Sequence, residues 1–332
     1  MRIAIISIVI IVAVIGTVLL VRSCGGDSPD AGLTELADTP APQTELSGGS
    51  SSAAPGPNGR LVDVGGHGLF IRTWGEGSPA VVIEPGIGDA GLVWQGVIDA
   101  LSGETQVALY DRAGYGRSDA GPLPRSADRV VAELTRLLPA APVEHPYVIV
   151  GHSLGAMHAL LYASEHPNLV AGVVLLDPPP IGFIKGERFP ELGEMAEQMT
   201  AASRREAEAA RTAGNEREAA RLEAVASEHE QMFETGWSWM ASVRTLGDTP
   251  LVVVASGVPN PEFGASASEF QRYWRSESEA LSALSTRGRF VFVEDSTHNL
   301  PGEATDEVVD AILWCIAASK DLPEYEVYQG EK

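Results

Sequence analysis

Short apolar runs alternate with helical patterns through most of the chain. Polar residues do not interrupt these runs, as expected for strands buried on both faces of a parallel sheet. The predicted strands are Ala80–Glu84, Val107–Tyr110, Tyr147–Val150, Val170–Leu176, Pro250–Ala255 and Phe290–Val293. Apolar residues recur at helical spacing in the intervening segments Val93–Leu101, Ala127–Leu138 and Ser268–Leu284, and in the closing segment Thr305–Ala318. The pattern predicts an α/β fold with helices on both faces of the sheet.

Two segments depart from this alternation. Arg60–Gly75 predicts a hairpin of two strands around its glycines. Residues 178–248 are charged, rich in Ala, Glu and Arg, and carry one apolar helical stripe near their end. We interpret this second segment as a helical lid inserted into the sheet domain. Its residues Met232, Phe233 and Trp237 are candidates for an apolar substrate wall, although such a stripe can also simply pack against the core.

The motif Gly151-His152-Ser153-Leu154-Gly155 follows a predicted strand and precedes a predicted helix. In this context, G-x-S-x-G is typical of a sharp turn that exposes a strained nucleophilic serine. The two glycines allow the strand and the helix to approach closely. We therefore predict that Ser153 is a nucleophile, although a serine can also act here only as a helix N-cap.

A nucleophilic serine needs a base, and the base needs an orienting acid. Of the seven histidines, only His298 lies in a loop after a late buried strand. It is therefore the predicted general base. Asp177 directly follows a strand and is the favoured acid, and Glu262, in the loop after the next strand, is the alternative.

The oxyanion of an acyl-transfer reaction needs backbone N–H donors. Leu154 directly follows the nucleophile and supplies the first candidate donor. Ile87 supplies the second, since Gly86 and Gly88 allow the loop after the Ala80–Glu84 strand to turn its N–H inward.

The chain resembles the α/β-hydrolase family over about residues 61–318. The motifs that carry the resemblance are Pro85–Gly88, Asp111–Ser118, Gly151–Gly155 and Thr297–His298. The resemblance implies a mostly parallel eight-stranded sheet with a helical lid inserted after the sixth strand. Many members place the acid at the position of Asn260, and an amide cannot hold a charge against an imidazolium. The family's alternative acid position corresponds to Asp177.

A serine nucleophile favours acyl chemistry over the dehalogenase and epoxide hydrolase branches of the family. The sequence thus predicts a serine hydrolase, most simply a carboxylesterase that cleaves a small-molecule ester through an acyl-enzyme. An acyltransferase, a peptidase and a non-catalytic binding domain on the same fold are the alternatives. We expect neither an organic cofactor nor a metal ion.

The N-terminal segment carries a long apolar run. Residues 3–21 are uncharged and would span about 28 Å as a helix, close to the thickness of a bilayer core. This length favours a retained membrane anchor over a cleaved signal peptide for residues 1–22. The hydrolase domain would then lie outside the cytoplasm. Cys24 adds lipid anchoring as an alternative, and secretion is another.

The remaining segments are defined by composition. Residues 23–59 are rich in Pro, Gly, Ser, Ala and Thr and predict a flexible linker. Residues 60–320 form the predicted hydrolase domain and residues 321–332 a C-terminal tail. The formal charge of −22, from 45 acidic and 23 basic residues, argues against a nucleic-acid partner. No feature of the sequence sets an oligomeric state.

Overall fold

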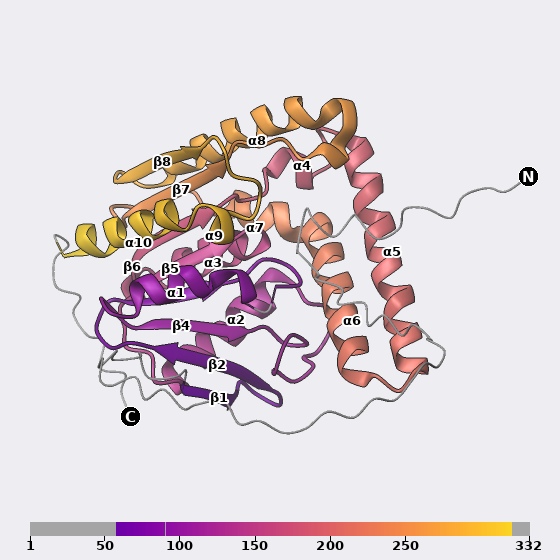
Figure 1. The fold of residues 1–332 in the computed structure, drawn as a ribbon, viewed down its shortest axis with the longest axis horizontal. Helices are drawn as coiled ribbons and strands as arrows, with labels where there is room; N and C mark the ends of the chain where they lie inside the picture. The colour runs from indigo at the N-terminus through magenta and orange to yellow at the C-terminus, as the bar shows by residue number, and fades with distance from the viewer. Residues whose placement is uncertain (1–57, 90, 321–332) are drawn as a thin grey trace, which may run out of the picture.

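A computed structural model describes residues 58–89 and 91–320, which form one eight-stranded sheet between helices (Figure 1). The sheet order is β1-β2-β4-β3-β5-β6-β7-β8. β2 runs antiparallel to both its neighbours, and β3 to β8 are mutually parallel. The strands are β1 (Asn58–Asp63), β2 (Gly68–Trp74), β3 (Ala80–Glu84), β4 (Val107–Asp111), β5 (Tyr147–His152), β6 (Val170–Leu176), β7 (Leu251–Ser256) and β8 (Gly288–Val293).

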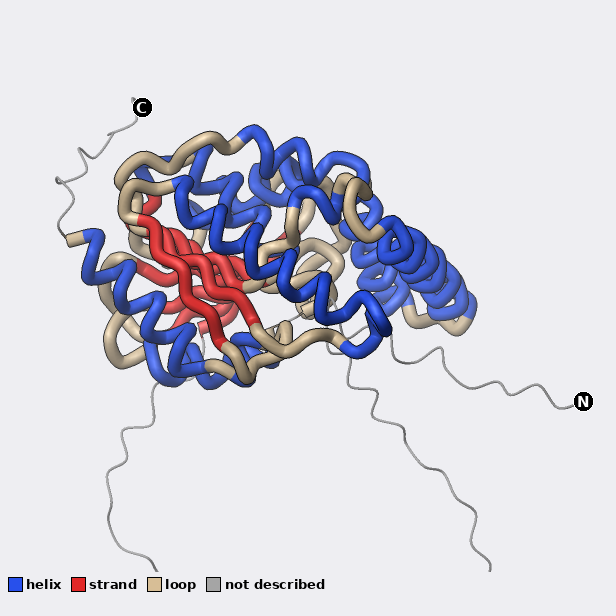
Figure 2. Tube along the Cα trace, turned by 90° about the horizontal axis from the view of Figure 1, so that it is seen from above, coloured by secondary structure: helices blue, strands red, loops and turns tan. Residues whose placement is uncertain are grey.

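The central strands are buried on both faces, as their unbroken apolar runs predict. In β3, Val81 and Ile83 pack into one core, whereas Ala80 and Val82 pack into the other. This alternation arises because successive side chains of a strand point to opposite faces. Figure 2 shows the sheet enclosed between the two layers of helices.

The two cores are closed by different helices. Side chains of α1 (Gln95–Leu101), α9 (Leu300–Glu303) and α10 (Thr305–Ser319) pack in one core. Those of α2 (Ala127–Ala140), α3 (Leu154–Glu165) and α8 (Ala267–Leu281) pack in the other. Short helical turns complete the connections: η2 (Leu92–Trp94), η3 (Pro167–Leu169), η5 (Pro261–Ser266) and η6 (Ser282–Leu284).

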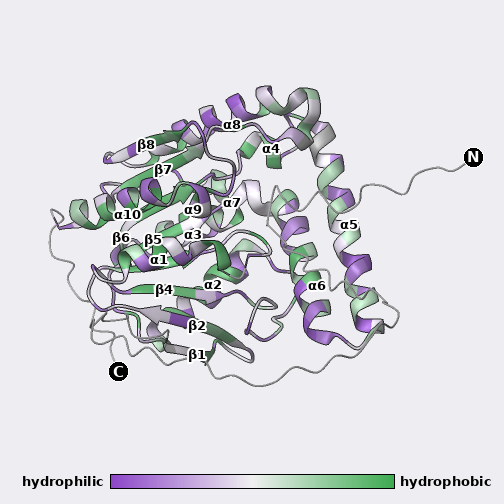
Figure 3. Ribbon diagram, viewed as in Figure 1, coloured by the Kyte–Doolittle hydropathy of each residue, from purple (hydrophilic) through white to green (hydrophobic). Residues whose placement is uncertain are grey.

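The segment between β6 and β7 is helical, as predicted for residues 178–248. It consists of α4 (Ile181–Ile184), α5 (Pro190–Thr212), α6 (Glu216–Gln231), the π-helical turn η4 (Met232–Gly236) and α7 (Trp237–Ser242). α5 and α6 lie side by side as a hairpin at one side of the sheet (Figure 1). Both contain hydrophilic as well as hydrophobic residues, in contrast to the hydrophobic central strands (Figure 3).

The predicted elements agree with the structure except at several boundaries. The helix predicted from Val93 begins with the 3₁₀ turn η2, and the helix predicted to end at Leu284 finishes with η6. Such tighter turns are frequent at helix ends and leave the apolar spacing almost unchanged, so periodicity does not distinguish them.

The predicted anchor of residues 1–22, the linker up to residue 57 and the tail of residues 321–332 lie outside the described residues. Within residues 58–89 and 91–320, every helix is too short or too polar to cross a bilayer.

Candidate active site

The turn between β5 and α3 holds Ser153 in a strained conformation. Its φ of 53° and ψ of −123° lie in a region of backbone conformation that residues other than glycine rarely adopt. A Cβ on Gly151 would collide with the backbone of Gly155, and a Cβ on Gly155 would collide with carbonyl oxygens of the β3 end. The two glycines therefore allow the close packing that holds the turn, as the motif predicts.

The structure brings His298 and Asp177 together from positions far apart in the chain. His298 Nδ1 lies 2.9 Å from Asp177 Oδ2, and the two side chains are 19% and 2% exposed. His298 Nε2 is buried and has no hydrogen-bond partner among the described residues. A histidine whose Nδ1–H is bound by a carboxylate keeps Nε2 available to accept a proton.

Asp177 is fixed in place by the end of β7. Its Oδ1 accepts the backbone N–H of Ser256 at 2.9 Å, and its Oδ2 accepts the Ser256 hydroxyl at 2.6 Å. Its own N–H donates to the carbonyl oxygen of Val254. Both oxygens of the buried carboxylate thus accept hydrogen bonds, which offsets the cost of burying its charge. No local pattern in the sequence indicates this role of Ser256, because its contact with Asp177 spans 79 residues.

The favoured acid of the sequence analysis is therefore the one that contacts His298. Glu262, the alternative, belongs to η5, and its side chain lies outside the described part of the structure. Asn260, at the position where many family members carry the acid, lies just before η5, and its carbonyl oxygen accepts the N–H of Phe263.

His152 supports the backbone of His298. Its Nε2 lies 2.8 Å from the carbonyl oxygen of His298, and the two imidazole rings are 4.8 Å apart. Burial, together with the neighbouring His298, lowers the pKa of His152 to about 3. The ring is therefore neutral near pH 7, and its Nε2–H donates to the carbonyl. This role of His152 has no local signal in the sequence, because it depends on the loop that carries His298.

The two predicted oxyanion donors lie beside the nucleophile. Leu154 is the first residue of α3, where backbone N–H groups lack helical acceptors. Ile87 lies in the loop after β3, and a Cβ on the adjacent Gly86 would lie 3.5 Å from Ser153 Cβ. Neither the Ile87 nor the Leu154 N–H donates to a hydrogen-bond acceptor among the described residues. Both N–H groups are thus available to a ligand.

Ser153 opens into an apolar pocket. Its other lining residues are apolar or aromatic: Pro179, Phe183, Met195, Ala196, Met199, Met232, Phe233, Phe263 and Trp274. The inserted helices contribute most of them. Because these residues come from five separate segments, sequence spacing identified only Met232 and Phe233.

Trp237, the third predicted wall residue, does not line this pocket. Its ring lies 5.0 Å from Lys185 Nζ instead. The physical reason is η4, because a π-helical turn is wider than an α-helical turn and changes the direction of the side chains that follow.

No group of three or more His, Cys, Asp or Glu side chains in the described part of the chain could hold a metal ion.

Comparisons with known proteins agree with this architecture. A family model described as the alpha/beta hydrolase fold matches residues 79–238. The uncharacterized protein YqjL of Bacillus subtilis is 28% identical over 255 residues, which cover 76% of this chain and 90% of that protein.

Solved structures show the same fold. A thermophilic esterase from Thermogutta terrifontis has a TM-score of 0.58 and 22% identity, over 76% of this chain and 94% of that chain. An enol-lactonase from Burkholderia xenovorans has a TM-score of 0.56 and 17% identity, over 78% of this chain and 100% of that chain. The matched family model, the sheet order and the strand–serine–helix turn lead to one conclusion: the chain is a member of the α/β-hydrolase family.

Proposed function

We propose that this protein is a serine hydrolase that cleaves carboxylic esters through an acyl-enzyme. The observation that carries the proposal is the His298–Asp177 pair, which leaves Nε2 of His298 without a hydrogen-bond partner in the described part of the chain. The His298 ring lies 5.7 Å from that of Trp274, which lines the same pocket as the strained Ser153. Ser153 attacks the ester carbonyl while His298 Nε2 takes the hydroxyl proton. Asp177 stabilises the imidazolium that forms.

The oxyanion of the tetrahedral intermediate accepts hydrogen bonds from the N–H groups of Ile87 and Leu154. When the intermediate collapses, the C–O bond to the alcohol breaks, and His298 returns its proton to the leaving oxygen. Water then attacks the acyl-enzyme by the same route and releases the carboxylic acid. The inserted helices act as a lid that supplies walls for the acyl group.

The pocket lining favours substrates with an apolar acyl group. Apart from the reactive serine, it consists of aliphatic, sulfur-containing and aromatic side chains. A charged acyl group would lose its hydration there without gaining a partner. Esters such as p-nitrophenyl butyrate should therefore react faster than p-nitrophenyl succinate.

The test is to replace Ser153 and measure both hydrolysis and labelling. Ser153→Ala should lower kcat for p-nitrophenyl butyrate by about 10⁴-fold or more and abolish labelling by a fluorophosphonate, because the nucleophile is lost. Ser242 is exposed, and Ser242→Ala is the matched control, which should retain full activity. Fluorophosphonate labelling of another serine in the Ser153→Ala variant would refute the assignment.

A further inference from the structure

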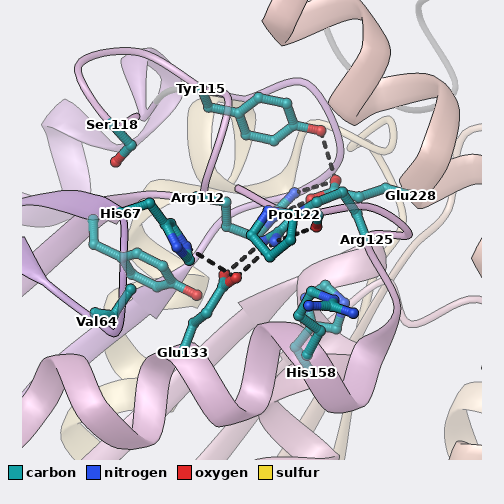
Figure 4. Close-up of polar contacts among 12 residues, drawn as sticks. Val64, His67, Arg112, Tyr115, Ser118, Pro122, Arg125, Glu133, His158 and Glu228 are labelled. Carbon is teal, nitrogen blue, oxygen red and sulfur yellow. Dashed lines mark hydrogen bonds and ion pairs between the residues drawn. The ribbon is translucent and has the colours of Figure 1, made fainter. Parts of the chain in front are cut away.

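A fully buried ion cluster links the inserted helix α6 to the core of the domain. It consists of Arg112 after β4, Glu84 at the end of β3 and Glu228 on α6, each no more than 1% exposed. Arg112 binds Glu228 with two parallel contacts, from Nε at 2.8 Å and from Nη2 at 2.9 Å (Figure 4). Paired contacts of this kind are geometrically specific as well as strong.

Arg112 uses all five of its N–H groups. Besides the two contacts to Glu228, Nη1 donates to Glu84 Oε1 at 2.9 Å. The other two acceptors are backbone carbonyls in the loop after β3: Nη1 donates to Pro85 O at 2.6 Å and Nη2 to Gly86 O at 2.9 Å. The guanidinium therefore fixes two successive peptide groups of the loop that contains Ile87.

Because the peptide group is planar, the contact of Arg112 with the Gly86 carbonyl also fixes the direction of the Ile87 N–H. The carbonyl of Gly86 and the N–H of Ile87 belong to one trans peptide, so they point in opposite directions. Holding the Gly86 carbonyl against Arg112 therefore directs the Ile87 N–H away from the buried cluster. The Gly86 Cα lies next to Ser153, which places this peptide beside the nucleophile.

Tyr115 fixes the following peptide. Its hydroxyl accepts the N–H of Gly88 at 3.2 Å. The same hydroxyl donates to Glu228 Oε2 at 2.6 Å (Figure 4). The peptide groups on both sides of Ile87 are thus held by two side chains, and both of these side chains are bound to Glu228.

We propose that Glu228 is a positioning residue, which acts through Arg112 and Tyr115 to orient the oxyanion donor Ile87. The proposal rests on the proposed serine hydrolase function. Among the described residues, the hydrogen bonds of Glu228 go to Arg112 and Tyr115 and not to Ser153, and Glu228 belongs to the inserted helix α6. The orientation of the Ile87 N–H therefore depends on the packing of α6 against the domain. Without α6, Arg112 would lose its two contacts with Glu228.

A second buried ion pair offers a matched control. Arg125 binds Glu133 with contacts of 2.7 and 2.6 Å, and both side chains are at most 3% exposed. Arg125 also meets α6, because its backbone N–H donates to the hydroxyl of Ser227. None of the hydrogen bonds of Arg125 or Glu133 reaches the loop from Pro85 to Gly88.

The experiment compares Glu228→Gln, Tyr115→Phe and Glu133→Gln in the full chain with p-nitrophenyl butyrate. Loss of a well-oriented oxyanion donor costs about 10²–10³-fold in kcat, and we expect a disordered donor to cost about tenfold or more in Glu228→Gln. KM should change little, because the interaction forms only in the transition state. Ki for a trifluoromethyl ketone, which forms a tetrahedral adduct with the serine, should rise by the same factor.

Tyr115→Phe should also lower kcat and raise Ki, each by a smaller factor than Glu228→Gln. If Glu228→Gln does not fold, the result for Tyr115→Phe decides the proposal. Glu133→Gln should lower the melting temperature but leave kcat unchanged. Folded Glu228→Gln and Tyr115→Phe enzymes with wild-type kcat and Ki would overturn the positioning role. Hydrolysis retained by Ser153→Ala would instead overturn the serine mechanism itself.

Discussion

Two residues of the candidate site, Ser153 and Asp177, adopt positive φ values of 53° and 46°. Both follow parallel strands, where the chain must turn sharply to present a side chain at the sheet edge. Backbone strain of this kind costs of order 1–3 kcal/mol per residue and persists only where the surroundings hold it. Here the surroundings are close glycine packing for Ser153 and the Ser256 contacts for Asp177.

The acid assignment can be tested at this scale. Asp177→Asn should lower kcat by about 10³–10⁴-fold, because an amide neither stabilises the imidazolium nor selects the tautomer with a free Nε2. Ester hydrolysis across pH 6–9 is the measurement. Glu262→Gln is the comparison variant and should behave as the wild type; a large loss in Glu262→Gln with an active Asp177→Asn would show that the acid is misassigned.

At the scale of single elements, α6 has functions that its apolar stripe alone does not reveal. Glu228 binds the buried cluster, and the adjacent His229 is 2% exposed. Both ring nitrogens of His229 are buried and lack hydrogen-bond partners among the described residues. Burial lowers the pKa of His229 to about 4, against the favourable influence of Glu228 on its charged form.

This buried neutral histidine predicts acid sensitivity. Below pH 6.5 the unfolded chain protonates this residue, whereas the folded chain resists protonation until about pH 4. The free energy of unfolding should therefore fall by about 1.4 kcal/mol per pH unit across this window because of His229.

His229→Leu removes both this proton uptake and two unpaired buried nitrogens. Urea unfolding at pH 7 should show a variant at least as stable as the wild type, and its stability should decline less steeply between pH 6.5 and 4. Between pH 7 and 8 the two profiles should run parallel. Profiles that stay parallel down to pH 4 would mean that His229 is protonated or partnered in the folded protein.

At the scale of the whole molecule, the parallel strands bring the reactive groups to one edge of the sheet. The Ile87 loop, Ser153, Asp177 and the His298 loop follow β3, β5, β6 and β8. These strands point the same way, so their carboxyl ends lie at the same edge. We propose that the N-terminal segment anchors this domain to a membrane, with the site outside the cytoplasm.

The anchoring proposal predicts a change of location without a change of chemistry. Fluorophosphonate labelling of the full chain should be found in the membrane fraction, and deletion of residues 2–22 should move it to the soluble fraction with kcat unchanged. The run of apolar residues is the reason, since burial of its side chains in lipid stabilises insertion. Soluble labelling of an uncleaved full chain would contradict the anchor, and a shortened mature protein would indicate a cleaved signal.

The sequence by itself determined the fold class, the order of strands and helices along the chain, and the position of Ser153 in a turn between a strand and a helix. These features depend on local signals: apolar runs, helical spacing and a motif contained within five residues. It also reduced the candidates for the general base to His298 and those for the acid to Asp177 and Glu262. The reason is that active-site residues of parallel sheets follow the carboxyl ends of strands.

Only the tertiary structure decided which groups meet. The contacts of Asp177 with His298 and Ser256 join residues 121 and 79 positions apart, and the bidentate pair of Arg112 with Glu228 joins residues 116 positions apart. Hydrophobic periodicity says which face of an element is buried, but not which partner covers it. The same limit explains Trp237, whose direction depends on a π-helical turn that leaves no periodic signal.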